Sequence, residues 1–74
     1  MNDFEINEEI LKNIKREINY SEKTKSEIAI AIGIKPPTLS QYLSGRAQPT
    51  LTTLTKLCQV LNISADDILP TRDK

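Results

Sequence analysis

The side chains in this sequence that are best suited to chemistry are hydrogen-bonding groups near the middle of the chain. Thr38, Ser40 and Gln41 lie within four residues of one another. A glutamine amide both donates and accepts, and a threonine offers a hydroxyl beside a methyl group. These groups suit the edges of nucleic-acid bases, because glutamine can pair bidentately with adenine and a threonine methyl can meet that of thymine. The chemistry they indicate is recognition.

Residues for catalysis or metal binding are scarce. The chain has no histidine and a single cysteine, Cys58, which falls on an apolar stripe where we expect a small core residue without an activating base nearby. A structural zinc site would need ligands that this composition lacks, and no phosphate-binding glycine loop is visible. We therefore expect no enzyme, no metal site and no cofactor.

Two short helices must position the polar residues. Thr24 followed by Glu27 is a capping box that starts the first helix, and Gly33 ends it in the left-handed conformation. Lys35 precedes a proline and is expected to be extended, and the helix over residues 36–44 then starts on two prolines, which the first helical positions tolerate. Two short helices joined in this way are typical of a helix-turn-helix, whose second helix enters the DNA major groove.

Helical spacing also governs the remaining sequence. Asn7 is predicted to cap a first helix, so that residues 1–6 form an N-terminal extension whose Phe4 and Ile6 fold back on the core. Thr50 is predicted to cap a fourth helix that Asn62 ends, and Ser64 a short fifth one. The tail 71–74 is expected to be frayed. The apolar stripes are Ile10, Leu11, Ile14 and Ile18; Ile28, Ala29 and Ile32; Leu39, Tyr42 and Leu43; and Leu51, Leu54, Leu57, Cys58 and Leu61. The prediction is one all-α domain over residues 1–74, with five helices.

Charge is divided unevenly along the chain, although the net charge is zero. Residues 1–22 hold six acids and three bases, whereas residues 23–56 hold five bases and one acid. The positive segment coincides with the predicted helix-turn-helix, as expected for a nucleic-acid partner. No apolar run reaches membrane-spanning length and the first residues are acidic, so we expect a cytoplasmic protein without a membrane partner.

The sequence resembles the lambda-repressor-like, or Cro/C1-type (XRE), helix-turn-helix family. The residues that support this resemblance are Glu27-Ile28-Ala29, Ile32-Gly33-Ile34, Thr38-Leu39-Ser40, Gly45-Arg46, Pro49-Thr50-Leu51, Leu54, Leu57, Asn62-Ile63-Ser64 and Asp66-Asp67-Ile68-Leu69. Each fragment is common, and their joint order and spacing are specific. The match runs from about Thr24 to Leu69.

The resemblance implies a compact five-helix fold and a set of DNA contacts. It places base reading on the start of the helix over residues 36–44, at Pro36, Pro37, Thr38, Ser40 and Gln41. It places contacts to the DNA backbone at Lys25, Ser26, Lys35, Ser44 and Arg46. Ser44 has an alternative role as a C-terminal helix cap. The two prolines depart from the polar residues usual at their positions, which concentrates base reading on few side chains.

The resemblance favours a sequence-specific transcriptional regulator of double-stranded DNA, most simply a repressor that binds as a homodimer. The apolar residues Ile63, Ile68, Leu69 and Pro70 near the chain end would supply the dimer contact, or else cap the monomer core. One alternative is the antitoxin of a toxin–antitoxin pair, with a toxin or another regulator as protein partner, because antitoxins of this fold share the paired prolines. The other alternative is a protein-interaction module that has lost DNA binding.

Overall fold

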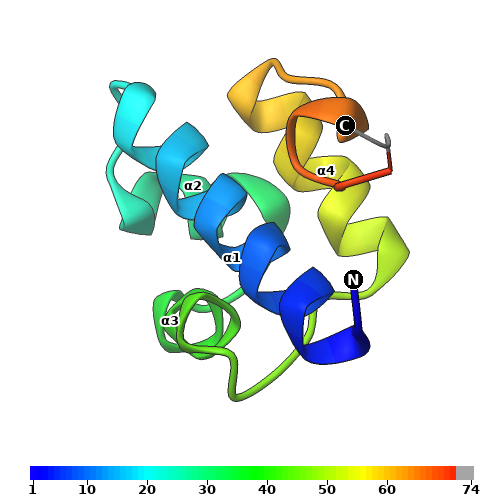
Figure 1. Ribbon diagram of the computed structural model, residues 1–74. Coiled ribbons are helices and arrows are strands. Elements are labelled where there is room, and N and C mark those ends of the chain that lie inside the picture. Colours follow the sequence, from blue (N-terminus) through cyan, green and yellow to red (C-terminus); the bar gives the residue numbers. More distant parts are fainter. Residues whose placement is uncertain (72–74) are drawn as a thin grey trace.

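A computed structural model describes residues 1–71 as four α-helices and one 3-10 turn, without a strand among these residues (Figure 1). The helices are α1 (Asp3–Tyr20), α2 (Lys25–Ile32), α3 (Pro36–Ser44) and α4 (Leu51–Leu61). The all-α prediction is confirmed, but the count of five helices is wrong. The predicted last helix is a single 3-10 turn, Ala65–Asp67, and most of the tail predicted to be frayed lies outside the described residues.

The first helix starts earlier than predicted. Asn2, and not Asn7, caps α1: the Glu5 N–H donates to Asn2 Oδ1 at 2.9 Å, and the Asn2 N–H donates to Glu5 Oε1 at 3.3 Å. This reciprocal pair satisfies two backbone donors that the first turn leaves open, so residues 3–6 become helix rather than an extension. Phe4 is consequently 72% exposed and does not fold back on the core.

The core is made of aliphatic side chains from every helix. Its central element is α2, which packs against both α3 and α4, while α1 covers α3. Ile28 and Ala29 of α2 are completely buried, and the small Ala29 lets a neighbouring helix approach closely. The buried apolar residues are Ile14, Ile18, Ile28, Ala29, Ile32, Leu39, Leu43, Leu57 and Ile68.

Leu51 departs from the predicted stripe of α4. Leu57 is buried, and Leu54, Cys58 and Leu61 are half-buried against the core, whereas Leu51 is 82% exposed. At about 100° of rotation per residue, Leu51 stands roughly 120° around the helix from Leu57. It therefore lies at the edge of the stripe, in the first turn of α4, where its side chain is left exposed.

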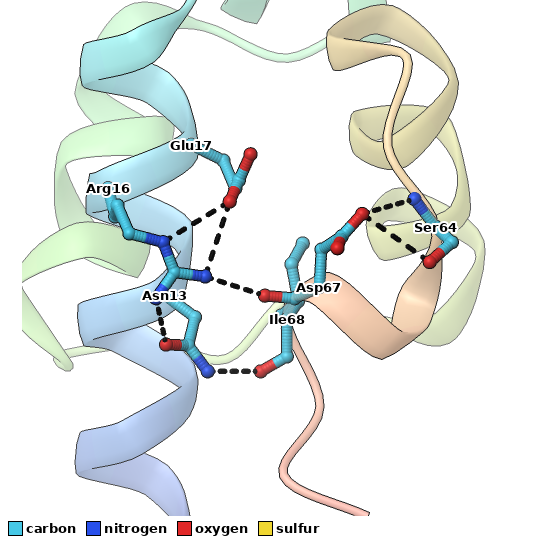
Figure 2. A network of polar contacts seen from close by, with 6 residues as sticks. All are labelled: Asn13, Arg16, Glu17, Ser64, Asp67 and Ile68. Atoms are coloured by element: carbon cyan, nitrogen blue, oxygen red, sulfur yellow. Dashed lines mark hydrogen bonds and ion pairs between the residues drawn. The ribbon is translucent and has the colours of Figure 1, made fainter.

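A polar network that the sequence did not indicate connects α1 to the 3-10 turn (Figure 2). The Asn13 amide donates to the Ile68 carbonyl at 2.8 Å, and Arg16 donates to Asn13 Oδ1 at 2.9 Å and to the Asp67 carbonyl at 3.0 Å. Glu17 holds the same guanidinium at 3.2 Å. Asn13 is the buried polar residue of the described chain, and this network satisfies both ends of its amide.

Candidate nucleic-acid interface

The turn between α2 and α3 has the geometry predicted from Gly33. This glycine is left-handed, with φ +81°, and its N–H donates to the Ile30 carbonyl at 3.1 Å. The next N–H, of Ile34, reaches back to the Ala29 carbonyl at 3.0 Å, which completes a Schellman motif. Ile34 is half-buried against the core. The turn thus fixes the direction in which α3 leaves α2.

The start of α2 is capped as predicted. The Glu27 N–H donates to Thr24 Oγ1 at 3.1 Å, and the Thr24 N–H donates to the Glu27 carboxylate at 2.9 Å. Hydrogen bonds donated to the Glu27 carboxylate, first by the Thr24 backbone and then by the Thr24 side chain, lower the pKa of Glu27. Lys25 and Ser26, the first two helical residues, are exposed. Their backbone N–H groups point out of the helix end, where an anion is favoured.

The start of α3 is built differently. Lys35 is extended, with φ −80° and ψ 145°, and makes no side-chain cap. Pro36 and Pro37 occupy the first two helical positions, as predicted, and have no N–H. The next amide, of Thr38, already donates to the Lys35 carbonyl at 2.9 Å. The first turn of α3 therefore offers side chains, and no free backbone donor, to a ligand.

The two faces of α3 separate the core from the predicted base-reading residues. Leu39 and Leu43 are buried and Tyr42 is half-buried, so the tyrosine is part of the packed stripe. Four of the five positions predicted to read bases are exposed, and the fifth, Thr38, is half-buried. Those four exposed positions are Pro36, Pro37, Ser40 and Gln41. The helix thus presents one small polar surface around Gln41.

The end of α3 repeats the Schellman motif at Gly45, with φ +82°. The Gly45 N–H donates to the Tyr42 carbonyl at 3.2 Å and the Arg46 N–H to the Gln41 carbonyl at 3.0 Å. The Ser44 hydroxyl also donates to the Gln41 carbonyl, at 3.1 Å, which is the capping alternative predicted for it. The side chains of Lys35 and Arg46 are exposed at the two ends of the helix.

Cys58 and possible metal ligands are the remaining candidates for chemistry in the described chain. Cys58 is half-buried among α4 side chains, and burial, together with the charge of Asp67, raises the pKa of its thiol. Residues 1–71 contain no cluster of three or more His, Cys, Asp or Glu side chains that could hold a metal ion. None of the helices among these residues has the length and apolar character needed to cross a bilayer.

The apolar residues predicted for a dimer contact do not all remain available. Ile68 is completely buried in the monomer, so the alternative that it caps the core is correct for this residue. Ile63, Leu69 and Pro70 are half-buried. Ile63 and Leu69 line an apolar groove of about 710 Å³ along α4, together with the exposed Leu51. The apolar surface near the chain end is therefore centred on α4.

Comparison with known proteins agrees with this geometry. A family model described as Helix-turn-helix (HTH_3) matches residues 11–68. Among solved structures, the solution structure of the SOS-response transcriptional repressor LexA from Eubacterium rectale is similar, with a TM-score of 0.80 and 27% identity over 95% of this chain and 78% of that one. A search of curated proteins gives no significant match. The chain belongs to the Cro/C1-type helix-turn-helix family of DNA-binding transcription regulators.

Proposed function

We propose that this protein is a sequence-specific regulator that binds double-stranded DNA with α3 in the major groove and represses transcription. The observation that supports this proposal most is the exposed polar surface of α3 around Gln41, on a helix that the Gly33 turn holds against α2. The similar LexA structure is that of a transcriptional repressor, which supports repression as the direction of control.

The direct test is selection of bound sequences from a pool of random duplexes. A sequence-specific protein should enrich one short motif, and that motif supplies the site for every later measurement. At low salt the protein should also bind random duplex weakly, because phosphate contacts do not depend on sequence. Failure to bind random duplex at low salt would favour the alternative of a protein-interaction module.

Contacts to the DNA backbone are proposed for the exposed residues at the ends of the two helices. These residues are Lys25, Ser26, Lys35, Ser44 and Arg46. Changing Lys25 or Arg46 to alanine should weaken binding to all duplexes alike and reduce the salt slope by about one for each contact. Lys56→Ala on α4 removes the same charge elsewhere and is the matched control. An unchanged slope in both variants would contradict the assignment.

We propose further that two chains bind one site with two-fold symmetry. The polar surface of one α3 spans few bases, and two copies about 34 Å apart would double the bases that are read. The apolar groove on α4, beside Leu51, is the surface we propose for the contact. Light scattering on the free protein and on its complex with the selected duplex measures the stoichiometry. One chain per site, or a selected site without inverted symmetry, would overturn the dimer.

A second candidate function is that of an antitoxin. It rests on Pro36 and Pro37 at the start of α3 and on Ser44 before Gly45 and Arg46, a combination that antitoxins of this fold share. A toxin gene beside this one, and a stable complex between the two products, would identify this case. The proposed DNA contacts would be the same in both functions.

A further inference from the structure

The first turn of α3 presents an apolar surface without a hydrogen-bond donor. Pro36 and Pro37 are both exposed, and neither has an N–H. The next two amides, of Thr38 and Leu39, both donate to the Lys35 carbonyl, at 2.9 Å and 3.3 Å. The proline rings carry only carbon–hydrogen groups, so this exposed surface has nothing to donate to the edge of a base.

The exposed surface of α3 changes in character along the helix. Thr38, predicted to read a base, is half-buried, so the exposed atoms of the first turn are mainly those of the two proline rings. Pro37 and the exposed Gln41 are four residues apart and therefore lie on the same side of the helix. The side proposed to face DNA is thus apolar at the start of α3 and polar one turn later.

Base edges in the major groove differ in how well they suit an apolar surface. Guanine presents two acceptors, adenine an acceptor and an amino group, and cytosine an amino group. A proline ring pairs with none of these, so covering them would remove their hydrogen bonds to water without replacement. Thymine is the one base of the four that adds an apolar group, the methyl on C5. Cytosine methylated at C5 presents the same methyl group.

The prolines also hold this surface rigidly in place. A proline side chain has no rotamer freedom to lose on burial, and its ring fixes φ. The left-handed turn at Gly33 sets the direction of α3, and Leu39 and Leu43 anchor the helix in the core. A methyl group that packs against Pro36 and Pro37 therefore contacts a surface that is already ordered.

We infer that Pro36 and Pro37 form a contact selective for the C5-methyl group of a pyrimidine in the major groove. This inference rests on the proposed function and names the chemical group that the start of α3 reads. The protein binds more tightly when the pyrimidine facing these rings is thymine rather than uracil, or 5-methylcytosine rather than cytosine. Methylation of a cytosine at this position strengthens binding, so the methylation state of the DNA is an input to regulation.

The first test changes the DNA and uses the unaltered full chain. Each thymine of the selected duplex is replaced in turn by uracil, which removes one methyl and keeps every hydrogen-bonding group of the base. We expect binding, measured by fluorescence anisotropy, to weaken roughly threefold to fivefold at one or two positions, as the burial of a single methyl predicts. At the same positions, a 5-methylcytosine–guanine pair should bind more tightly than the unmethylated pair by a similar factor.

The two arms of this test distinguish the sources of the methyl group. A loss with uracil together with a gain with 5-methylcytosine supports a contact to the methyl itself. A loss with uracil alone would restrict the contact to thymine and overturn the sensitivity to cytosine methylation. No effect of either base at any position would overturn the whole inference.

The second test identifies the residues that make the contact. Pro36→Ser and Pro37→Ser are combined in one variant, because a serine hydroxyl can donate to a base acceptor. This variant should bind the thymine and uracil duplexes alike at the positions found above. Pro49→Ser, which removes a proline from the linker before α4, is the matched control and should keep the difference. Circular dichroism checks that both variants are folded. A difference that persists in the double variant would assign the methyl contact to another residue and overturn the inference.

Failure of this inference differs from failure of the proposed function. Suppose that the unaltered protein enriches a motif and that Gln41→Ala weakens binding to it, while uracil and 5-methylcytosine change nothing. Base reading by α3 then stands, and only the methyl contact fails. If the unaltered protein binds no duplex, both fail.

Discussion

The two helices of the helix-turn-helix end alike and begin differently. Both α2 and α3 end in a left-handed glycine, Gly33 or Gly45, with the same pair of backward hydrogen bonds. At their starts, α2 has a capping box between Thr24 and Glu27, whereas α3 has two prolines and no cap. The C-terminal ends of the two helices determine the direction in which the chain continues. Their N-terminal starts determine which hydrogen-bonding groups each helix can offer to a ligand.

The difference between the two helix starts indicates that α2 and α3 make different kinds of contact with DNA. The start of α2 leaves backbone N–H groups and Lys25 directed outward, which suits phosphate regardless of sequence. The start of α3 has no free amide, so any contact it makes must come from side chains. We expect α2 to position the protein on the duplex and α3 to supply most of the discrimination between sequences.

A large expected effect tests whether the two glycine ends of the helices are equivalent. Gly33→Ala and Gly45→Ala should each lower stability by roughly 1–2 kcal/mol, because a left-handed conformation strains any residue with a Cβ. Gly45→Ala should cost more, since its new Cβ would stand 3.3 Å from Leu11 Cδ1, whereas the Cβ at Gly33 meets nothing within 4 Å. Thermal melts without DNA measure both, and an equal or larger loss at Gly33 would contradict this ranking.

The position of Gly33 also permits a test that separates structure from recognition. Valine at this position should lower the melting temperature more than alanine does, because β-branched residues are the least suited to positive φ. The loss should be the same with and without DNA. A variant of normal stability that binds DNA poorly would show instead that Gly33 belongs to the binding surface.

Gln41 tests the role assigned to α3. Gln41→Ala should cost roughly 1–3 kcal/mol on the selected site, because an adenine would lose its bidentate partner. Binding to random duplex should barely change. Ser40→Ala, on the same exposed side of the helix, is the comparison variant. An equal loss on both duplexes would refute base reading by Gln41.

A smaller effect distinguishes the two helix starts. Thr24→Ala should cost about 1 kcal/mol of stability, because the Glu27 N–H loses its acceptor. Replacing Lys35 by serine, a capping residue, should add little stability. Pro37 has no N–H to donate to the new hydroxyl, and the Thr38 amide is already bonded to the Lys35 carbonyl. Chemical denaturation of Thr24→Ala and Lys35→Ser compares the two. A gain from Lys35→Ser as large as the loss from Thr24→Ala would remove the distinction.

The smallest expected effect is a dependence on pH at the start of α2. The pKa of Glu27 is lowered by its hydrogen bonds from Thr24, so its ionised form stabilises the fold above the ordinary glutamate pKa. This stabilisation declines as the pH falls through the lowered pKa. The difference in melting temperature between the unaltered protein and Glu27→Gln should therefore shrink from neutral to acidic pH. A difference that stays constant would contradict the role of the charge.

Local chemistry predicted most helix boundaries, because the residues that set them are neighbours in the chain. The cap at Thr24, the left-handed conformation of Gly33 and the end of α4 at Asn62, with φ 56°, are all confirmed. The start of α1 was predicted wrongly, although Asn2 followed by Glu5 fits the capping-box pattern. Asn7 precedes two acids and an apolar run and was an equally good local candidate.

Tertiary contacts were the part that the sequence could not supply. Asn13 stands next to the stripe of α1, and its partner, the carbonyl of Ile68, is 55 residues away. Leu51 has helical spacing with its stripe but lies outside the packed side. The roles proposed for residues on DNA remain predictions.

The Asn13 amide determines how α1 is aligned along its axis. Ile10, Ile14 and Ile18 recur every four residues, so sliding the helix by about one turn toward its C-terminus would put Ile10 and Ile14 in the places of the buried Ile14 and Ile18. The same slide would put Glu9 opposite the Ile68 carbonyl in place of Asn13. An ionised carboxylate can only accept hydrogen bonds, so it would repel that oxygen. The Asn13 amide therefore disfavours this shifted register of a repetitive helix.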